Sequence, residues 1–256
     1  MRPARPQDGV AWITGASAGI GRAVALRLLA DGWTVAITAR RAEVLDQLAT
    51  ANQGRVIAAP GDITDAAAMR QAMASAQQGG RTVALAILNA GTYVPLSGEK
   101  FDLDAFRQQI EINVIGCATS LAAVLPGMVA RRSGQIAIVA SVAGYRGLPT
   151  GVGYGASKAA LNNMAESLKF DLDRSGVMVN IVNPGFVRTP LTDKNEFPMP
   201  FLLEADDAAD RIVRGLQAGH FEITFPKRFT YMLKALRLLP NAVYFPLVGR
   251  ATRGKA

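Results

Sequence analysis

The sequence predicts a single α/β domain in which helices cover both faces of a mostly parallel sheet of about seven strands. Short apolar segments alternate with amphipathic segments along the chain of 256 residues. This alternation is typical of repeated strand–helix–strand units with right-handed crossovers. Residues 82–89 are almost wholly apolar, as expected for a strand that is buried on both faces. A glycine-rich turn joins the first apolar segment to the first amphipathic one.

Four strands and three helices are expected in the first part of the chain. Apolar runs mark the strands, and apolar side chains recur every three or four residues in the helices, as Val24 and Leu28 do in the first one. In order, these elements are strand 9–15, helix 19–31, strand 34–40, helix 42–51, strand 55–62, helix 66–76 and strand 82–89.

The same alternation continues in the second part of the chain. Residues 104–131 form a long helical stretch with Pro126 close to its end. The elements expected here are helix 104–131, strand 135–141, helix 154–173, strand 177–183, helix 204–217 and strand 222–225. Several prolines interrupt residues 186–203, so we expect an irregular, mobile flap in that segment.

The composition is that of an ordinary globular enzyme, with 50% hydrophobic and 19% charged residues. The single cysteine, Cys117, has no partner for an internal disulfide and is expected to be a small buried side chain. Residues 1–8 lack the apolar core of a secretion signal. No apolar run reaches the roughly 20 residues that span a bilayer. We therefore expect a cytoplasmic protein.

The formal net charge of +8 is concentrated in the C-terminal tail. Residues 225–256 hold seven Lys and Arg side chains and no Asp or Glu, and apolar side chains lie between the cations. We expect residues 227–256 to be an extension that covers the substrate cavity or forms a subunit interface. The alternative is a peripheral membrane contact, with apolar side chains in lipid and cations on anionic headgroups. No recognition motif accompanies the charge, so no nucleic-acid partner is expected.

A phosphate-binding loop is predicted between the first strand and the first helix. Gly15, Gly19 and Gly21 permit a tight turn in which a pyrophosphate approaches the helix N-terminus, where free N–H groups favour negative charge. Ser17 and Ile20 belong to the same loop and are also assigned to the cofactor site. Residues 1–226 are therefore expected to form a Rossmann-type dinucleotide-binding and catalytic domain.

The end of the second strand indicates which dinucleotide is bound. NAD sites place a carboxylate there, whereas this chain has Arg40 and Arg41, which could bind a 2′-phosphate. The alternative is that both arginines are solvated charges at a helix start. NADP is therefore the expected cofactor, with NAD possible.

Two further strand ends are candidates for the adenosine half of the site. Asp62 could accept a hydrogen bond from the adenine amino group, with Ile63 beside it. Asn89, Ala90 and Gly91 could pass beneath the ribose. Each segment could instead be an ordinary turn that ends a strand.

The candidate catalytic residues come from three separate segments. Tyr154 and Lys158 are four residues apart in a helix and therefore share one face. Ser141 ends the fifth strand, and Asn113 lies in the long helix. A tyrosine has an ordinary pKa of about 10, and we expect the nearby ammonium and an oxidised nicotinamide to lower it. A lone Tyr-x-x-x-Lys would more often be structural.

Metal chemistry has little support in the sequence. His220 is the only histidine, and it lies between a helix and the last strand. There is no Cys-x-x-Cys pair either, so no metal site is expected.

Together these residues resemble the short-chain dehydrogenase/reductase family over about residues 9–189. The positions that match are Thr14, Gly15, Gly19, Gly21, Asp62, Asn89, Ala90, Gly91, Asn113, Ser141, Tyr154, Lys158, Pro184, Gly185 and Thr189. The wider glycine spacing of sugar-nucleotide epimerases and the longer Tyr-to-Lys gap of enoyl reductases are not found. One departure is Ala18, where NADP-preferring relatives often have a basic residue. The NADP assignment therefore rests on Arg40 and Arg41.

The resemblance implies a role for each matching residue. Tyr154 would be the general acid in reduction, Ser141 would orient the carbonyl, and Lys158 would bind the nicotinamide ribose and lower the tyrosine pKa. Asn113 would support a water that links Lys158 to solvent. Pro184, Gly185, Val187 and Thr189 would line the nicotinamide.

The predicted function is an NADP-dependent oxidoreductase that interconverts a carbonyl and a secondary alcohol on a hydrophobic small molecule. The resemblance also implies a homodimer or homotetramer. The alternative function is a catalytically silent dinucleotide-binding regulator. An intact set of Asn113, Ser141, Tyr154 and Lys158 argues against that alternative, because a binding module does not need a proton relay.

Overall fold

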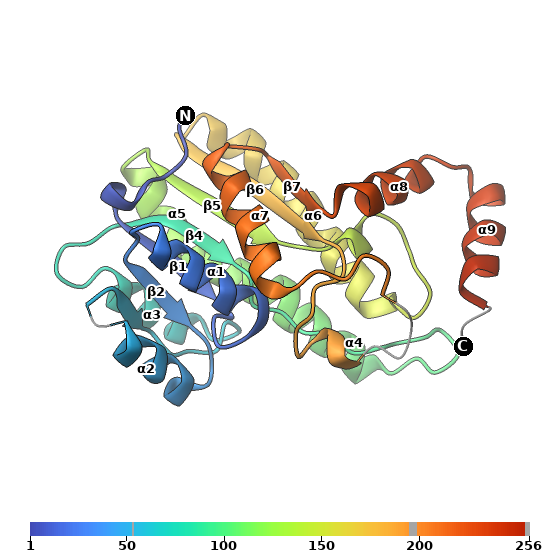
Figure 1. Ribbon diagram of the computed structural model, residues 1–256, viewed down its shortest axis with the longest axis horizontal. Helices are drawn as coiled ribbons and strands as arrows, with labels where there is room; N and C mark the ends of the chain where they lie inside the picture. Colours follow the sequence, from blue (N-terminus) through green and yellow to red (C-terminus); the bar gives the residue numbers. More distant parts are fainter. Residues whose placement is uncertain (53, 195–198, 254–256) are drawn as a thin grey trace.

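A computed structural model describes residues 1–52, 54–194 and 199–253 of the chain. Its centre is a seven-stranded sheet in the order β3-β2-β1-β4-β5-β6-β7, and all neighbouring strands pair in parallel (Figure 1). The strands are β1 Val10–Thr14, β2 Val35–Thr38, β3 Val56–Ala58, β4 Val83–Leu88, β5 Gly134–Val139, β6 Val177–Pro184 and β7 Glu222–Phe225.

Helices cover both faces of the sheet, as the sequence predicts. The helices that pack on it are α1 Gly19–Ala30, α2 Ala42–Ala51, α3 Ala66–Ala76, α5 Gly116–Ala130, α6 Val152–Asp173 and α7 Ala205–Gln217. Alternate residues of β1 divide the core: Ala11 and Ile13 pack with α1, α2 and α7, whereas Val10 and Trp12 pack with α3, α5 and α6. Side chains that alternate in direction along each strand thus build two apolar layers around one sheet.

The predicted strands and helices are all present, and the sheet is entirely rather than mostly parallel. Cys117 is buried, as expected. The long helix differs in its middle, because α4 Leu103–Ile110 and α5 are joined by a π-helical turn, Glu111–Ile115. This composite helix is long and apolar enough to cross a membrane. In the fold, however, its buried side chains pack against β4, β5 and α3.

Two helices follow the last strand, where the sequence predicted one helix in the C-terminal extension. They are α8 Lys227–Arg237 and α9 Asn241–Arg253. Figure 1 shows α8 continuing from β7 beyond the sheet and α9 lying farther out. Of the predicted flap, the structure describes residues 186–194 and 199–203, including a short 3₁₀ turn at Thr192–Lys194. Residues 195–198 lie outside the described part.

The loop after β5 approaches α6 very closely. It contains the 3₁₀ turn Val142–Gly144, which begins directly after Ser141. A Cβ atom on Gly144 would lie 2.6 Å from the carbonyl carbon of Lys158 and 2.7 Å from the side-chain nitrogen of Asn162. Only a glycine fits between this loop and the helix. The absence of a side chain at Gly144 therefore lets Ser141 lie close to α6, the helix that carries Tyr154 and Lys158.

We predict that Gly144→Ala lowers the free energy of unfolding by about 1–3 kcal/mol, because the added methyl group must push the loop away from the α6 backbone. Chemical denaturation measures the change. Gly147→Ala is the matched control, because a Cβ atom at Gly147 meets nothing within 4 Å. Equal stability losses in the two variants would contradict the proposed steric role.

Candidate active site

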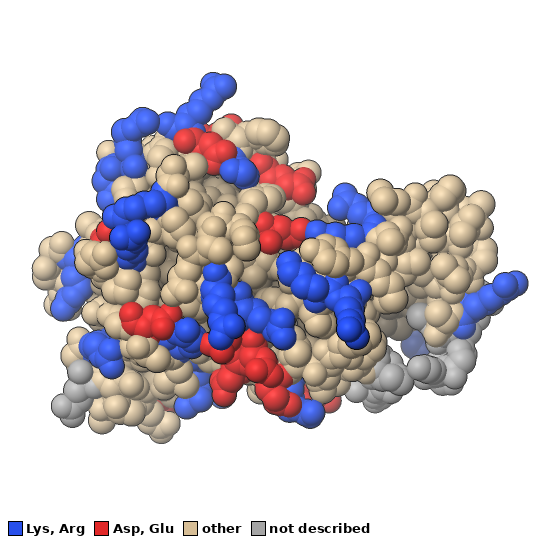
Figure 2. All heavy atoms as spheres, turned by 45° about the horizontal axis from the view of Figure 1, so that its top comes forward, with Lys and Arg blue, Asp and Glu red and all other residues tan. Residues whose placement is uncertain are grey.

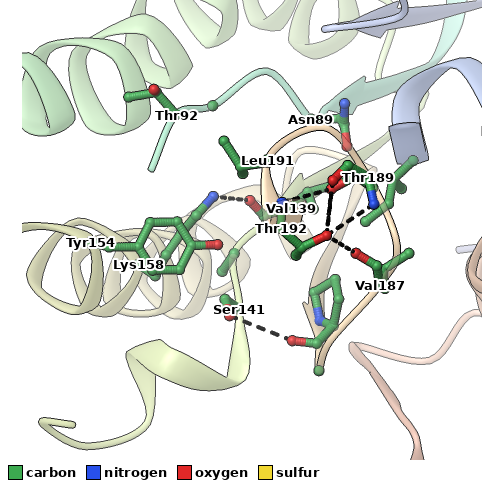
Figure 3. Close-up of a pocket in the computed structure, with 15 residues that line it drawn as sticks. Asn89, Thr92, Val139, Ser141, Tyr154, Lys158, Val187, Thr189, Leu191 and Thr192 are labelled. Carbon is green, nitrogen blue, oxygen red and sulfur yellow. Dashed lines mark hydrogen bonds between the residues drawn. The ribbon is translucent and has the colours of Figure 1, made fainter. Parts of the chain in front are cut away.

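A pocket opens at the carboxyl ends of the central strands (Figure 3). It brings together ten of the residues predicted from the sequence. These are Ile20, Asn89, Gly91, Ser141, Tyr154, Lys158, Pro184, Gly185, Val187 and Thr189. Parallel sheets of this kind bind ligands at this edge, where the loops after neighbouring strands converge.

The glycine loop at the rim of the pocket is a cradle with no room for side chains. Gly15 and Gly19 have φ angles of +69° and +54°, which favour glycine. A Cβ atom on Gly21 would lie 2.4 Å from the carbonyl oxygen of Gly15. The loop leads into the N-terminus of α1, so a phosphate can approach free backbone N–H groups there.

The end of β4 holds the glycine loop in place. The backbone N–H groups of Asn89 and Ala90 donate to the Thr14 hydroxyl over 3.1 and 3.2 Å. The Asn89 amide donates to the Thr14 carbonyl over 3.2 Å. The alternative interpretation of residues 89–91 as a plain turn is therefore incomplete, because these residues brace the candidate phosphate site.

Two basic residues lie beside the cradle at the end of β2. The Arg41 guanidinium donates to the Ser17 hydroxyl over 3.1 Å, so side chains of two loops meet at this corner. Arg40 and Arg41 are both exposed. The Thr64 backbone N–H donates to Asp62, and this bond, the Thr64 hydroxyl and the charge of Arg40 hold the pKa of Asp62 below its ordinary value, against the effect of burial.

The side chain of Ile63 is used in the core. It is buried and lies where a Cβ atom on Gly116 of α5 would be, with its Cδ1 atom at 2.4 Å from that position. Only the backbone of Ile63 is therefore left to contact a cofactor.

Tyr154 and Ser141 face each other across the pocket (Figure 3). Burial raises the pKa of Tyr154 to about 12, and the interaction with the Ser141 hydroxyl opposes this rise. The Tyr93 ring packs edge-on against the Tyr154 ring, with 5.2 Å between centroids. The Ser141 hydroxyl accepts a hydrogen bond from the Ala143 N–H over 3.1 Å and points its own proton at the Pro184 carbonyl 3.5 Å away.

Lys158 is an almost fully buried cation, with only 4% of its surface exposed. Its ammonium donates to the Val139 carbonyl over 2.9 Å and lies 5.6 Å from the centroid of the Tyr154 ring. Burial lowers the pKa of Lys158 to about 8. Burial is the largest influence on the pKa of Tyr154, and the lowering expected from the ammonium together with an oxidised nicotinamide stays a prediction.

Asn113 is fully buried in the π-helical turn. Its side-chain oxygen accepts from the Thr92 N–H over 2.7 Å, and its amide donates to the Thr92 carbonyl and the Ser157 hydroxyl over 3.0 and 2.9 Å. The side chain of Asn113 therefore ties the loop after β4 to α6. π-helical turns of this kind often occur at functional sites.

Five further residues line the pocket: Thr92, Val139, Ala140, Leu191 and Thr192, of which Leu191 and Thr192 lie in the predicted flap and Thr92 opens the loop after β4, a segment the sequence assigns to substrate specificity. Val139 and Ala140 directly precede Ser141, so their position on the same strand end was a usable signal. The Thr192 hydroxyl donates to the Val187 carbonyl over 2.8 Å and accepts from the Thr189 N–H over 2.9 Å, which closes one wall of the pocket. No pattern in the sequence marks that contact.

The chain matches the family model for short chain dehydrogenases over residues 9–198. It is 38% identical over 239 residues to an uncharacterized oxidoreductase of Myxococcus xanthus, a match that covers 91% of this chain and 94% of the relative.

Two solved structures are similar over almost the whole chain. A short chain dehydrogenase from Burkholderia cenocepacia in complex with NADP superposes with a TM-score of 0.83 at 25% identity, covering 96% of this chain and 99% of that one. A short-chain dehydrogenase from Streptomyces avermitilis gives a TM-score of 0.82 at 27% identity, covering 96% and 98% of the two chains. With the glycine loop and the Tyr-x-x-x-Lys pocket, these similarities show that the chain is an oxidoreductase of the short-chain dehydrogenase family.

Proposed function

We propose that the protein is an NADP-dependent oxidoreductase that interconverts a carbonyl and a secondary alcohol on a hydrophobic small molecule. The observation that carries this proposal is the arrangement of Tyr154, Ser141 and Lys158 on one pocket next to the glycine loop. An acid, an oxygen-binding hydroxyl and a cation then surround the space where a carbonyl and a nicotinamide would meet.

The residues present fit NADP. The loop of Gly15, Gly19 and Gly21 suits a pyrophosphate, since side chains at these positions would collide with Ala90, Thr189 and the Gly15 carbonyl, so that only glycines permit this tight turn into α1. Arg41, held by Ser17, and Arg40 are the donors for a 2′-phosphate. The similar Burkholderia protein in complex with NADP supports this choice. When bound, the cofactor supplies the hydride.

The side chains of the pocket handle the proton and the substrate oxygen. In reduction, the Ser141 hydroxyl binds the carbonyl oxygen and the Tyr154 phenol gives that oxygen its proton. Since burial raises the pKa of Tyr154 to about 12, the phenol keeps its proton at neutral pH and is ready to act as an acid. Oxidation needs the phenolate instead.

Lys158 and Asn113 support this proton transfer. The Lys158 ammonium is the donor available for the ribose hydroxyls, and its charge stabilises the phenolate that is left after the proton has moved. Asn113 joins the loop after β4 to Ser157, one residue before Lys158. A regulator without catalysis would not need a buried ammonium beside a half-buried phenol, so catalytic silence is not favoured.

Apolar side chains line the pocket at Ile20, Val139, Val187 and Leu191, and an aromatic cluster begins directly after Gly185, which also lines it. Phe186 of the flap packs against Phe229 of α8 with ring centroids 5.6 Å apart, and Phe201 packs against the same ring at 6.1 Å. Tyr93 borders Tyr154. Binding of an apolar substrate against such side chains is favourable, because it removes apolar surface from water. We therefore propose a hydrophobic carbonyl or alcohol as the substrate.

We predict that Tyr154→Phe lowers kcat for carbonyl reduction by roughly 10²- to 10⁴-fold, because the proton donor is lost. NADPH binding, measured by nicotinamide fluorescence, should stay within about twofold of the native value, since a change of that size is less than 0.5 kcal/mol. Tyr93→Phe removes a neighbouring hydroxyl and should keep kcat. The proposed role of Tyr154 is wrong if its variant reduces carbonyls as fast as the Tyr93 variant does.

For Arg41→Ala we expect the Kd of NADPH to rise roughly 10- to 100-fold, because a charge-assisted bond to the 2′-phosphate is lost. Titration calorimetry with NADPH and with NADH measures the change. The Kd of NADH should hardly move, since NADH has no such phosphate. Arg107→Ala removes an exposed arginine from α4 and serves as the control. Equal loss of affinity for both cofactors would refute the assignment of Arg41.

The pH dependence should reflect Lys158. The ratio kcat/KM for NADPH reports groups of the free enzyme. We expect it to fall as pH rises through about 8, because the ammonium, whose pKa burial lowers to about 8, then loses its proton and charge. Lys158→Arg should move this fall beyond about pH 10, since a guanidinium stays protonated. A native profile that is flat across this range would contradict the prediction.

A further inference from the structure

The helices after β7 expose an unusual amount of apolar surface. We define the tail surface as the apolar side chains of α8, α9 and their connection that are at least about half exposed. They are Tyr231, Met232, Leu238, Val243, Phe245 and Leu247. Leu238 is 84% exposed and Phe245 65% exposed. Contiguous apolar patches of this kind mark interaction sites on soluble proteins.

Helical spacing places four of these six side chains on two stripes, while Met232 and Phe245 lie on neighbouring sides of the same helices. In α8 and just after it, residues 231, 235 and 238 follow each other at intervals of four and three, so Tyr231 and Leu238 share a face. In α9, Val243, Leu247 and Arg250 share a face for the same reason. The opposite side of α8 is already used, because Phe229 and Thr230 are buried against the body of the protein.

Cations without acidic neighbours surround the tail surface. Residues 226–253 contain Lys and Arg but no Asp or Glu. Lys234 is paired with Glu222 of β7, whereas no salt bridge is found for Lys227, Arg228, Arg237 or Arg250 within the described residues. In Figure 2 the lobe at the right is almost entirely uncharged, with Lys and Arg at its edge.

We propose that the tail surface docks on an anionic lipid bilayer. A bilayer is complementary to both features of the tail surface: its acyl boundary accepts the apolar side chains, and its anionic headgroups attract the cations. A second copy of this chain would bring an equally basic lobe against the first, and like charges in contact oppose such a pairing. A nucleic acid would match the charge but not the exposed Leu238 and Phe245.

The tail surface is held firmly by the loop that follows Ser141. The Arg146 guanidinium donates to the carbonyls of Leu236, Arg237 and Leu239 over 3.0, 3.1 and 2.7 Å and so caps the end of α8. It also donates to the Asn241 side chain over 2.6 Å and stacks on the Tyr244 ring at 3.7 Å. Both tail helices are thereby fixed to one loop, so docking would orient the whole domain on the lipid.

The orientation matters for the pocket if the proposed function holds. Phe229 on the inner side of α8 touches Phe186 and Phe201 of the flap, and Phe186 directly follows Gly185, which lines the pocket. A docked tail surface would then lie one helix away from the apolar entrance. A hydrophobic substrate dissolved in the bilayer would have only this short path to cross. The docking itself does not depend on catalysis.

The test is sedimentation of the full-length protein with vesicles. We expect the protein to pellet with vesicles of phosphatidylcholine and phosphatidylglycerol at low salt. Binding should weaken at least about tenfold with pure phosphatidylcholine, and added salt should weaken it too, because the cations lose their attraction. Absence of binding to the anionic vesicles at low salt would overturn the proposal, whatever the enzyme activity.

A pair of variants locates the contact. Phe245→Glu places a carboxylate in the tail surface and should lower vesicle binding at least about tenfold. Phe170→Glu makes the same change at a phenylalanine of α6 that is 81% exposed, and it should leave binding unchanged. Both variants should keep native circular dichroism and cofactor binding. Equal binding by the two variants would overturn the assignment of this surface.

Sedimentation velocity separates a lipid from a second copy as the occupant. The native protein and Phe245→Glu should have the same oligomeric state in the absence of vesicles. If Phe245→Glu instead dissociates an oligomer, the tail surface is a subunit interface and the bilayer proposal fails. The bilayer proposal also fails if the protein pellets with duplex DNA and not with vesicles.

Discussion

The burial of the Lys158 ammonium is the constraint that organises the candidate active site. Taking a charged group out of water is costly unless polar partners replace the water. Here the Val139 carbonyl accepts from the ammonium over 2.9 Å at the end of β5. That bond requires α6 to lie close to the strand end, which the absence of a side chain at Gly144 allows. The position of one cation therefore depends on the sheet, the loop and the helix together.

A second polar group joins this site to the C-terminal helices. Glu222 of β7 accepts hydrogen bonds from the Tyr145 hydroxyl over 2.6 Å and the Asn183 amide over 3.1 Å, and it pairs with Lys234 of α8. Burial alone would raise the pKa of Glu222, but these donors hold it below its ordinary value. The carboxylate thus links the loop after Ser141, the end of β6 and α8. The loop beside the pocket and the first tail helix therefore share one network of hydrogen bonds and an ion pair.

Much of the fold could be predicted from the sequence because its signals are local. Apolar runs mark the strands, and glycines with a required φ or close approach mark the cofactor turn, as Gly15 and Gly21 do. The four-residue spacing of Tyr154 and Lys158 is enough to place both on one face of a helix. Contacts between distant segments have no such signal: Arg146 caps a helix that begins about 80 residues later, and no local pattern indicates that bond. The sequence shows the cation near Tyr154 but not the burial that raises the pKa of this tyrosine, and the lowering expected with an oxidised nicotinamide stays a prediction.

No local sequence pattern predicts the π-helical turn around Asn113 either, and this turn affects the packing of the helices on both sides of it. An α-helix advances by about 100° per residue, so one extra residue in a regular helix would rotate everything beyond it by about that angle. The helix of residues 103–130 changes neighbours along its length: α4 packs against α6, whereas α5 packs against α3 and the sheet. The π-helical turn absorbs that extra residue, so deleting one residue there would leave the apolar side of α5 facing the core but would remove the turn that places Asn113 beside Thr92.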